Sequence, residues 1–333
     1  MELRAGYKRT EVGVIPADWE VHPISELAAT SSGTTPPRAQ FERYFRDGIY
    51  SWVKTLDLNN AELFETQESI TDFALKEISI QLHQPGAVLV AMYGGFNQIG
   101  RTALIRMPAC VNQALTAINT DWEKLVPEFL LRVLNHRVGH WKRIASSSRK
   151  DPNITGKDIR DFQIPCPPVP EQEAIAEALG DADALIKSLE RLIAKKGDLK
   201  LGAMQELLRP KDGWTAGKLS DLGIFLKGGG VKKDQCLSGE LPCVRYGEIY
   251  TMHSEWIRDF RSRISEAVAL TATRLKAGDI LFAGSGETKA EIGKCVAFID
   301  TFAAYAGGDI VILRPKHPSG SFWGYYLNTA PVN

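Results

Sequence analysis

The feature of this sequence that most constrains its fold is an internal repeat. Aligning the chain with itself at an offset of about 195 residues produces a series of matches in a single order. Residues 24–27 match 219–222, and residues 85–89 match 277–281. The other pairs are 18–19 with 213–214, 32–33 with 227–228, 99–101 with 292–294 and 129–131 with 322–324. Six ordered matches are hard to obtain by chance, so the chain is predicted to fold as two similar units.

Each repeat is predicted to mix strands and helices. Short apolar runs that follow a glycine are typical of buried strands. The repeats correspond as follows: strands at 87–91 and 280–283, hairpin partners at 102–105 and 294–299, and Gly-rich loops at 93–98 and 284–289. Residues 127–134 predict a helix, because Pro127 suits a first helical turn. The predicted fold class is therefore mixed α/β, with two similar globular domains.

Composition sets outer limits on the class of protein. The chain has 333 residues, a length that suits two domains, and its forty basic and forty acidic side chains give no net charge. A protein that coats DNA would be strongly basic, whereas a specific reader needs only a basic face. No run of about twenty apolar residues predicts a membrane span. Five scattered cysteines and the lack of an apolar signal region favour a cytoplasmic location.

The segment between the repeats predicts one long helix. Pro170 lies where a helix start tolerates proline, and Pro210 and Gly213 follow the predicted end. A helix from residue 171 to 209 would be roughly 58 Å long. Its apolar residues alternate steps of four and three, which is a heptad stripe that needs a partner helix. The stripe consists of Ile175, Leu179, Ala182, Ile186, Leu189 and Ile193.

Three segments together resemble the specificity subunits of type I restriction-modification enzymes (HsdS). Residues 164–179 read I-P-C-P-P-V-P-E-Q-E-A-I-A-E-A-L, which is similar to that family's entry into its central helix. Residues 200–208 resemble the exit from that helix, and residues 7–19 resemble the entry into the first domain. The resemblance implies a non-catalytic DNA reader. Each repeat would be a target-recognition domain that reads one half of a split site in double-stranded DNA.

The resemblance also implies partners and domain limits. Modification (methyltransferase) subunits would dock on the spacer and carry S-adenosylmethionine, a separate restriction/translocase subunit would cleave, and this chain would hold no cofactor. The expected domains are residues 1–165, a spacer at 166–210 and a second domain at 211–333. Since no counterpart of residues 136–209 follows the second repeat, we expect a truncated second domain that lacks its own spacer helix. The apolar stripe is then expected to pair in trans, as a homodimer or on the modification subunit.

Polar and basic loops are the candidates for contact with DNA, because base edges and phosphates need donors, acceptors and cations. The two sets of loops differ in chemistry, which predicts two different half-sites. The candidates in the first repeat are Thr34, Thr35, Arg38, Gln40, Arg43, Tyr93, Asn97, Gln98, Arg101, Arg149 and Lys150. Those in the second repeat are Lys232, Lys233, Ser285, Thr288, Lys289 and Lys294.

The sequence leaves two other functions open. Asp279, Glu287 and Lys289 fit the acidic-plus-lysine pattern of a metal-dependent nuclease. Alternatively, the chain is an assembly subunit without DNA specificity. His136 and His140 are four residues apart in a predicted helix, a spacing that suits a metal, but no third ligand is suitably placed, so no metal site is predicted.

Overall fold

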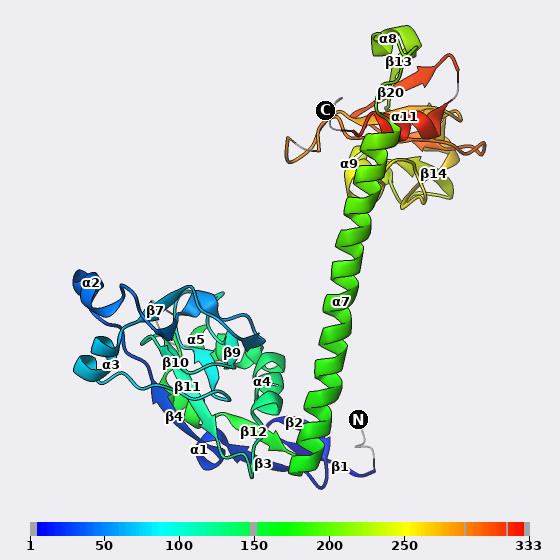
Figure 1. Cartoon of the computed structure of the whole chain (residues 1–333). Coiled ribbons are helices and arrows are strands. Elements are labelled where there is room, and N and C mark those ends of the chain that lie inside the picture. The colour runs from blue at the N-terminus through cyan, green and yellow to red at the C-terminus, as the bar shows by residue number, and fades with distance from the viewer. Residues whose placement is uncertain (1–4, 147–151, 290, 318, 330–333) are drawn as a thin grey trace. The chain divides into compact units, whose positions relative to one another are not determined.

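The computed structural model describes residues 5–146, 152–289, 291–317 and 319–329 and divides into two compact units. We call Met1–Ser188 the first unit and Leu189–Asn333 the second unit. The division falls within helix α7 (Val169–Leu207), which begins and ends two residues before the predicted limits of 171 and 209 (Figure 1). The long helix between the repeats is therefore confirmed. In the described ranges, no helix combines the length and the apolar character needed to cross a membrane.

The first unit is built on a five-stranded sheet of order β4-β11-β8-β9-β6. Strand β8 has four buried residues of four, as does β9, in agreement with the apolar runs seen in the sequence. A smaller sheet of order β10-β5-β7 lies in the same unit, and β12 pairs with β3. The bounds are β1 (Tyr7–Thr10), β2 (Gly13–Pro16), β3 (Glu20–Pro23), α1 (Ile24–Leu27), β4 (Ala28–Ser32), η1 (Arg38–Gln40), α2 (Phe41–Tyr44), β5 (Tyr50–Val53), η2 (Thr55–Asp57), β6 (Glu62–Leu63), β7 (Glu68–Ile70), α3 (Asp72–Ile78), β8 (Val88–Ala91), β9 (Thr102–Ile105), β10 (Ala109–Val111), β11 (Leu115–Thr120), α4 (Pro127–His136), α5 (Val138–Ser146), α6 (Gly156–Arg160) and β12 (Gln163–Cys166).

The second unit repeats this plan. Its main sheet has the order β13-β20-β17-β18, and its smaller sheet has the order β15-β14-β19-β16. Helix α1 begins at Ile24 and its counterpart α8 at Leu219, which is the predicted offset. The bounds are α8 (Leu219–Leu222), β13 (Gly223–Lys227), η3 (Lys233–Gln235), β14 (Leu241–Val244), α9 (Tyr246–Thr251), β15 (Ser262–Ile264), α10 (Glu266–Ala269), β16 (Thr273–Arg274), β17 (Ile280–Ala283), β18 (Cys295–Ala297), β19 (Tyr305–Ala306), β20 (Ile310–Pro315) and α11 (Gly320–Tyr326).

The two units also share helix caps and β-hairpins at equivalent places. Thr71 caps α3 by accepting a hydrogen bond from the amide of Ala74, and Ser265 caps α10 in the same way from Val268. The predicted hairpins are also confirmed, because β8 pairs antiparallel with β9 and β17 with β18. The repeat seen in the sequence is thus a repeat of folded units.

The prediction that His136 and His140 share a helix is wrong. Helix α4 ends at His136, and Arg137 has φ −100° and ψ 20° before α5 begins at Val138. The ring of His140 instead packs edge-on against Trp141 and Phe162, with ring centroids 5.2 and 5.0 Å away. Burial in this aromatic cluster lowers the pKa of His140. The two imidazoles therefore do not form the paired arrangement that a metal would need.

Candidate nucleic-acid interface and helix anchor

The topology of the first unit brings two predicted DNA-contact loops to one end of the main sheet. Ser32, the last residue of β4, pairs with Thr116 at the start of β11, and Leu115 pairs with Ala91, the last residue of β8. The same end carries the start of β9 at Thr102. The loops that follow β4 and β8 therefore leave the same end of the sheet, on either side of the start of β11. They hold Thr34, Thr35, Tyr93, Asn97, Gln98 and Arg101.

These side chains differ in their solvent exposure and in their hydrogen bonds to other side chains. Tyr93 is 36% exposed and Asn97 is also exposed. The guanidinium of Arg101 donates to the side-chain oxygen of Gln98 at 2.8 Å, and the hydroxyl of Thr35 donates to Gln113. A pre-formed Gln98–Arg101 pair presents a fixed set of donors at the sheet end, which is the type of element that base readout needs.

The second unit has the equivalent sheet end with different residues. Loop 284–289 follows β17, and its Thr288 and Lys289 are exposed while Ser285 is half-buried. Lys294, just before β18, differs from this group because its ammonium donates to the backbone oxygens of His253 at 3.0 Å and Tyr250 at 3.4 Å. The ammonium group of Lys294 therefore already has two hydrogen-bond acceptors within the second unit.

Three further described candidates of the first unit, Arg38, Gln40 and Arg43, lie in η1 and α2, before the first strand of its smaller sheet. Arg38 lies 2.6 Å from Glu68 and stacks over the Phe45 ring at 4.3 Å. Arg43 forms a bidentate ion pair with Glu77. Gln40 is exposed and Arg149 and Lys150 lie outside the described residues. The two described arginines thus have partners in the unit, a fact that the sequence did not reveal.

The geometry opposes the nuclease alternative. Asp279 precedes β17 and is 1% exposed, and both of its carboxylate oxygens accept from Arg314, at 2.8 and 2.7 Å. Glu287 and Lys289 follow the other end of the same strand. The two carboxylates therefore cannot share a metal. Among the residues that the structure describes, no group of three histidine, cysteine or acidic side chains is placed to hold a metal ion.

One buried side chain anchors the start of α7 to the first unit. Gln172 is fully buried, and its amide oxygen accepts from the backbone N–H of Val126 at 2.9 Å. Its amide nitrogen donates to the backbone oxygens of Lys124 at 2.9 Å and Pro167 at 3.0 Å. The bonds to Val126 and Lys124 tie the first turn of α7 to the segment before α4, and the bond to Pro167 fixes the residues that lead into α7. This glutamine belongs to the P-P-V-P-E-Q segment, to which sequence reasoning assigned no individual roles.

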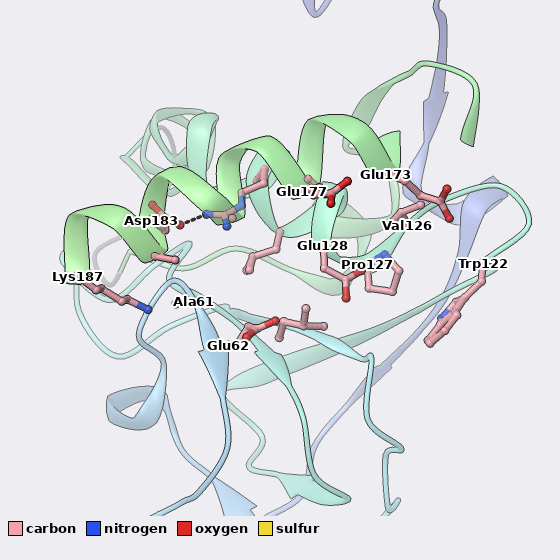
Figure 2. A pocket seen from close by; sticks show the side chains of 16 residues that line it. Ala61, Glu62, Trp122, Val126, Pro127, Glu128, Glu173, Glu177, Asp183 and Lys187 are labelled. Carbon is pink, nitrogen blue, oxygen red and sulfur yellow. Dashed lines mark hydrogen bonds and ion pairs between the residues drawn. The ribbon is translucent and has the colours of Figure 1, made fainter. Parts of the chain in front are cut away.

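A groove of about 730 Å³ runs between α4, β6 and the first turns of α7 (Figure 2). Arg132 donates to Asp183 across it, drawn as a dashed line in Figure 2. Its acidic lining residues are Glu62, Glu128, Glu173, Glu177 and Asp183, against Arg132 and Lys187. Arg106 pairs with Glu62 and Glu128, and Arg132 pairs with Asp183, which leaves Glu173 and Glu177 against Lys187. A lining without an excess of positive charge is better suited to a protein partner than to phosphate.

Most of the predicted apolar stripe of α7 is exposed. Ile175 packs against the core of the first unit. Further along, Leu179 is 45% exposed, Ile186 54%, Leu189 48% and Ile193 71%, and Ala182 is exposed as well. A run of large apolar side chains in water is a common mark of an interaction surface.

Sequence reasoning also missed two cations in the second unit. Arg245 follows the last residue of β14, and Arg261 precedes β15. Neither belongs to a polar loop that the sequence singles out. Only the internal comparison of the two units draws attention to them.

Two similar α/β units joined through one helix define a protein with a duplicated domain, and comparison with known proteins gives its family. A model of the type I restriction modification DNA specificity domain matches residues 16–195, more than half of the chain. The chain belongs to this family.

The relatives are themselves specificity subunits. The chain is 27% identical over 189 residues to the type I restriction enzyme MjaIX specificity subunit of Methanocaldococcus jannaschii, covering 56% of this chain and 42% of that protein. It is 22% identical over 185 residues to the EcoR124I/EcoR124II specificity subunit of Escherichia coli, covering 55% and 45%. The chain thus spans less than half the length of these curated relatives.

The fold agrees with solved structures. The S subunit of a type I restriction-modification system from M. genitalium matches with a TM-score of 0.58 and 16% identity, over 98% of this chain and 79% of that one. The HsdS subunit of Thermoanaerobacter tengcongensis matches with a TM-score of 0.50 and 18% identity, over 94% and 80%. At these identities, the likeness establishes the fold.

Proposed function

We propose that this chain is the DNA-reading specificity subunit of a type I restriction-modification system and performs no catalysis itself. One observation carries the proposal: both units present loops at the same end of equivalent sheets, but with different side chains. Tyr93, Asn97 and Gln98 in the first unit stand where Ser285, Thr288 and Lys289 stand in the second. Equivalent frames with different loop chemistry suit a bipartite target with two unlike half-sites.

The partners are part of the same proposal. Modification subunits that carry S-adenosylmethionine dock on α7 and the acidic groove, a restriction/translocase subunit joins the complex, and the assembly works in the cytoplasm. The exposed stripe from Leu179 to Ile193 supports a helical partner, which is a modification subunit or the same stripe of a second copy. The domain limits at residues 165 and 210 belong to this proposal as well.

The test is co-purification with a cognate modification subunit, followed by mapping of methylated positions in host DNA. A split motif with a fixed gap, methylated only when this chain is present, is the expected result. A complex that methylates no such motif would instead assign the chain an assembly role, and the absence of any complex would overturn the proposal.

The stripe is tested separately by sedimentation. The double variant Leu189→Asp with Ile193→Asp places two charges on the exposed stripe and is expected to abolish pairing. The matched control, Glu190→Gln with Arg191→Gln, changes neighbouring charges outside the stripe. A wild-type chain that stays monomeric at micromolar concentration would exclude the homodimer.

A further inference from the structure

The smaller sheets of the two units place a cation at the same point of the fold. Strand β5 ends at Val53 and is followed by Lys54, and strand β14 ends at Val244 and is followed by Arg245. The backbone N–H of each cation donates to an acidic side chain three residues later, at 2.7 Å for Lys54 and 3.3 Å for Arg245. Lys54 and Arg245 are therefore structural counterparts.

The residue that pairs with the penultimate residue of β5 differs from the one that pairs with the penultimate residue of β14. Trp52 of β5 pairs with Glu68 of β7, whereas Cys243 of β14 pairs with Ser262 of β15. Both partner strands run antiparallel, so Glu68 and Ser262 occupy one register position. The first unit thus has a carboxylate where the second has a hydroxyl.

In the first unit that carboxylate neutralises the cations. Lys54 donates to Glu68, and the guanidinium of Arg38 lies 2.6 Å from the same side chain. Burial acts to raise the pKa of Glu68, but the hydrogen bonds from Lys54 and Arg38 outweigh it and the net shift is downward. Glu68 therefore stays ionised at neutral pH and forms ion pairs with both Lys54 and Arg38.

In the second unit the equivalent cations have no such partner. A concavity of about 420 Å³ is lined by Lys233, Arg245 and Arg261, and Glu248 is its acidic lining residue. Glu248 accepts from the hydroxyl of Ser262. Within the described part of the chain, the three cations form no ion pair within 4.0 Å. Three cations against one carboxylate leave an excess of positive charge that the first unit lacks at this place.

We propose that this concavity binds phosphate groups of the DNA backbone and that Arg245 and Arg261 are positioning contacts of the second unit. The inference rests on the proposed function and deepens it. Arginine presents a planar fork of donors that matches phosphate oxygens, and each neutralised phosphate releases condensed counterions. Because phosphate contacts fix the position of a reader without reading bases, these residues set affinity rather than sequence preference.

The experiment uses the full chain and a fluorescein-labelled duplex of about 30 base pairs with random sequence, followed by anisotropy over a range of salt concentrations. Arg245→Gln and Arg261→Gln are each expected to lower the slope of log K against log salt by about 0.9. Lys54→Gln is the matched control, with no change expected because Glu68 already neutralises that ammonium. Glu68→Gln frees two cations in the first unit and is expected to steepen the slope.

The outcomes distinguish a failure of the phosphate site from a failure of the proposed function. No DNA binding by the wild-type chain or its complex with modification subunits would count against the proposed function itself. DNA binding with an unchanged salt slope in both Arg245→Gln and Arg261→Gln would overturn only the phosphate site. A Lys54→Gln variant that lowers the slope as much as Arg245→Gln would equally overturn it, because the contrast between the units would then be absent.

Discussion

Replacing Gln172 with alanine tests how α7 is attached to the first unit. The side chain is fully buried and forms three hydrogen bonds with the backbone groups of Val126, Lys124 and Pro167. Each bond contributes about 1 kcal/mol net, and a buried group left without a partner costs about 1–3 kcal/mol. Three lost bonds and a buried Val126 N–H without its wild-type acceptor together give an expected cost of about 4–6 kcal/mol of local stability for Gln172→Ala.

Hydrogen exchange measures this loss directly. Peptides that cover residues 120–130 and the first turns of α7 should exchange faster in Gln172→Ala, by the factor that this free energy implies. Gln172→Glu keeps the acceptor but loses both donors and places negative charge against two carbonyls, so it should be no milder at neutral pH. Gln205→Ala, an exposed glutamine of the same helix, is the control. A loss below about 1 kcal/mol in Gln172→Ala would refute the anchoring role.

Three further predictions follow from buried or paired groups. Arg314→Leu leaves the buried carboxylate of Asp279 without its partner, and urea unfolding of the second unit should show a loss of about 3–5 kcal/mol; an unchanged midpoint would contradict this. Hydrogen bonds with Glu20 and Glu26 raise the pKa of His22 above 6.5, so its stabilisation is fully present below pH 6.5 and is lost as pH rises through the raised value. The difference in unfolding free energy between wild type and His22→Gln should therefore shrink at alkaline pH, and a difference that grows there would reverse the sign. Burial raises the pKa of four thiols from 9.0 to about 12, so their thiolate fractions fall roughly 1,000-fold, and alkylation of the three that are buried in the fold, Cys110, Cys243 and Cys295, should require unfolding. The four thiols are those of Cys110, Cys166, Cys243 and Cys295.

The frame of this protein could be predicted from sequence because its signals are local. Apolar runs after glycine marked β8 and β17, Pro127 marked the start of α4, and the heptad pattern marked α7. Each of these signals depends on neighbours within one element. The ordered repeat then allowed one unit to support the other.

The partners of individual side chains could not be predicted, because they come from distant parts of the chain. Arg43 was selected as a free cation of a basic loop, yet its partner Glu77 lies on α3, 34 residues away. Gln172 was visible in its motif, but its role depends on the backbone of Lys124, 48 residues earlier. The helix break at Arg137 likewise has no proline beside it, and Gly139, two residues later, lies inside α5 rather than at the break. Tertiary contacts decide such details.

The duplication itself explains how the exposed loops of the two units can differ without loss of stability. Each unit has its own buried clusters, which hold the sheets, whereas loops 93–98 and 284–289 lie at sheet ends and are largely exposed. An exposed substitution away from special features changes stability by about 0.5 kcal/mol or less, whereas a core truncation costs about 2–5 kcal/mol. The same frame can therefore carry Tyr93 and Gln98 in one copy and Thr288 and Lys289 in the other. The effects of substitutions in the two loops on stability should be additive, since each loop belongs to a separate compact unit.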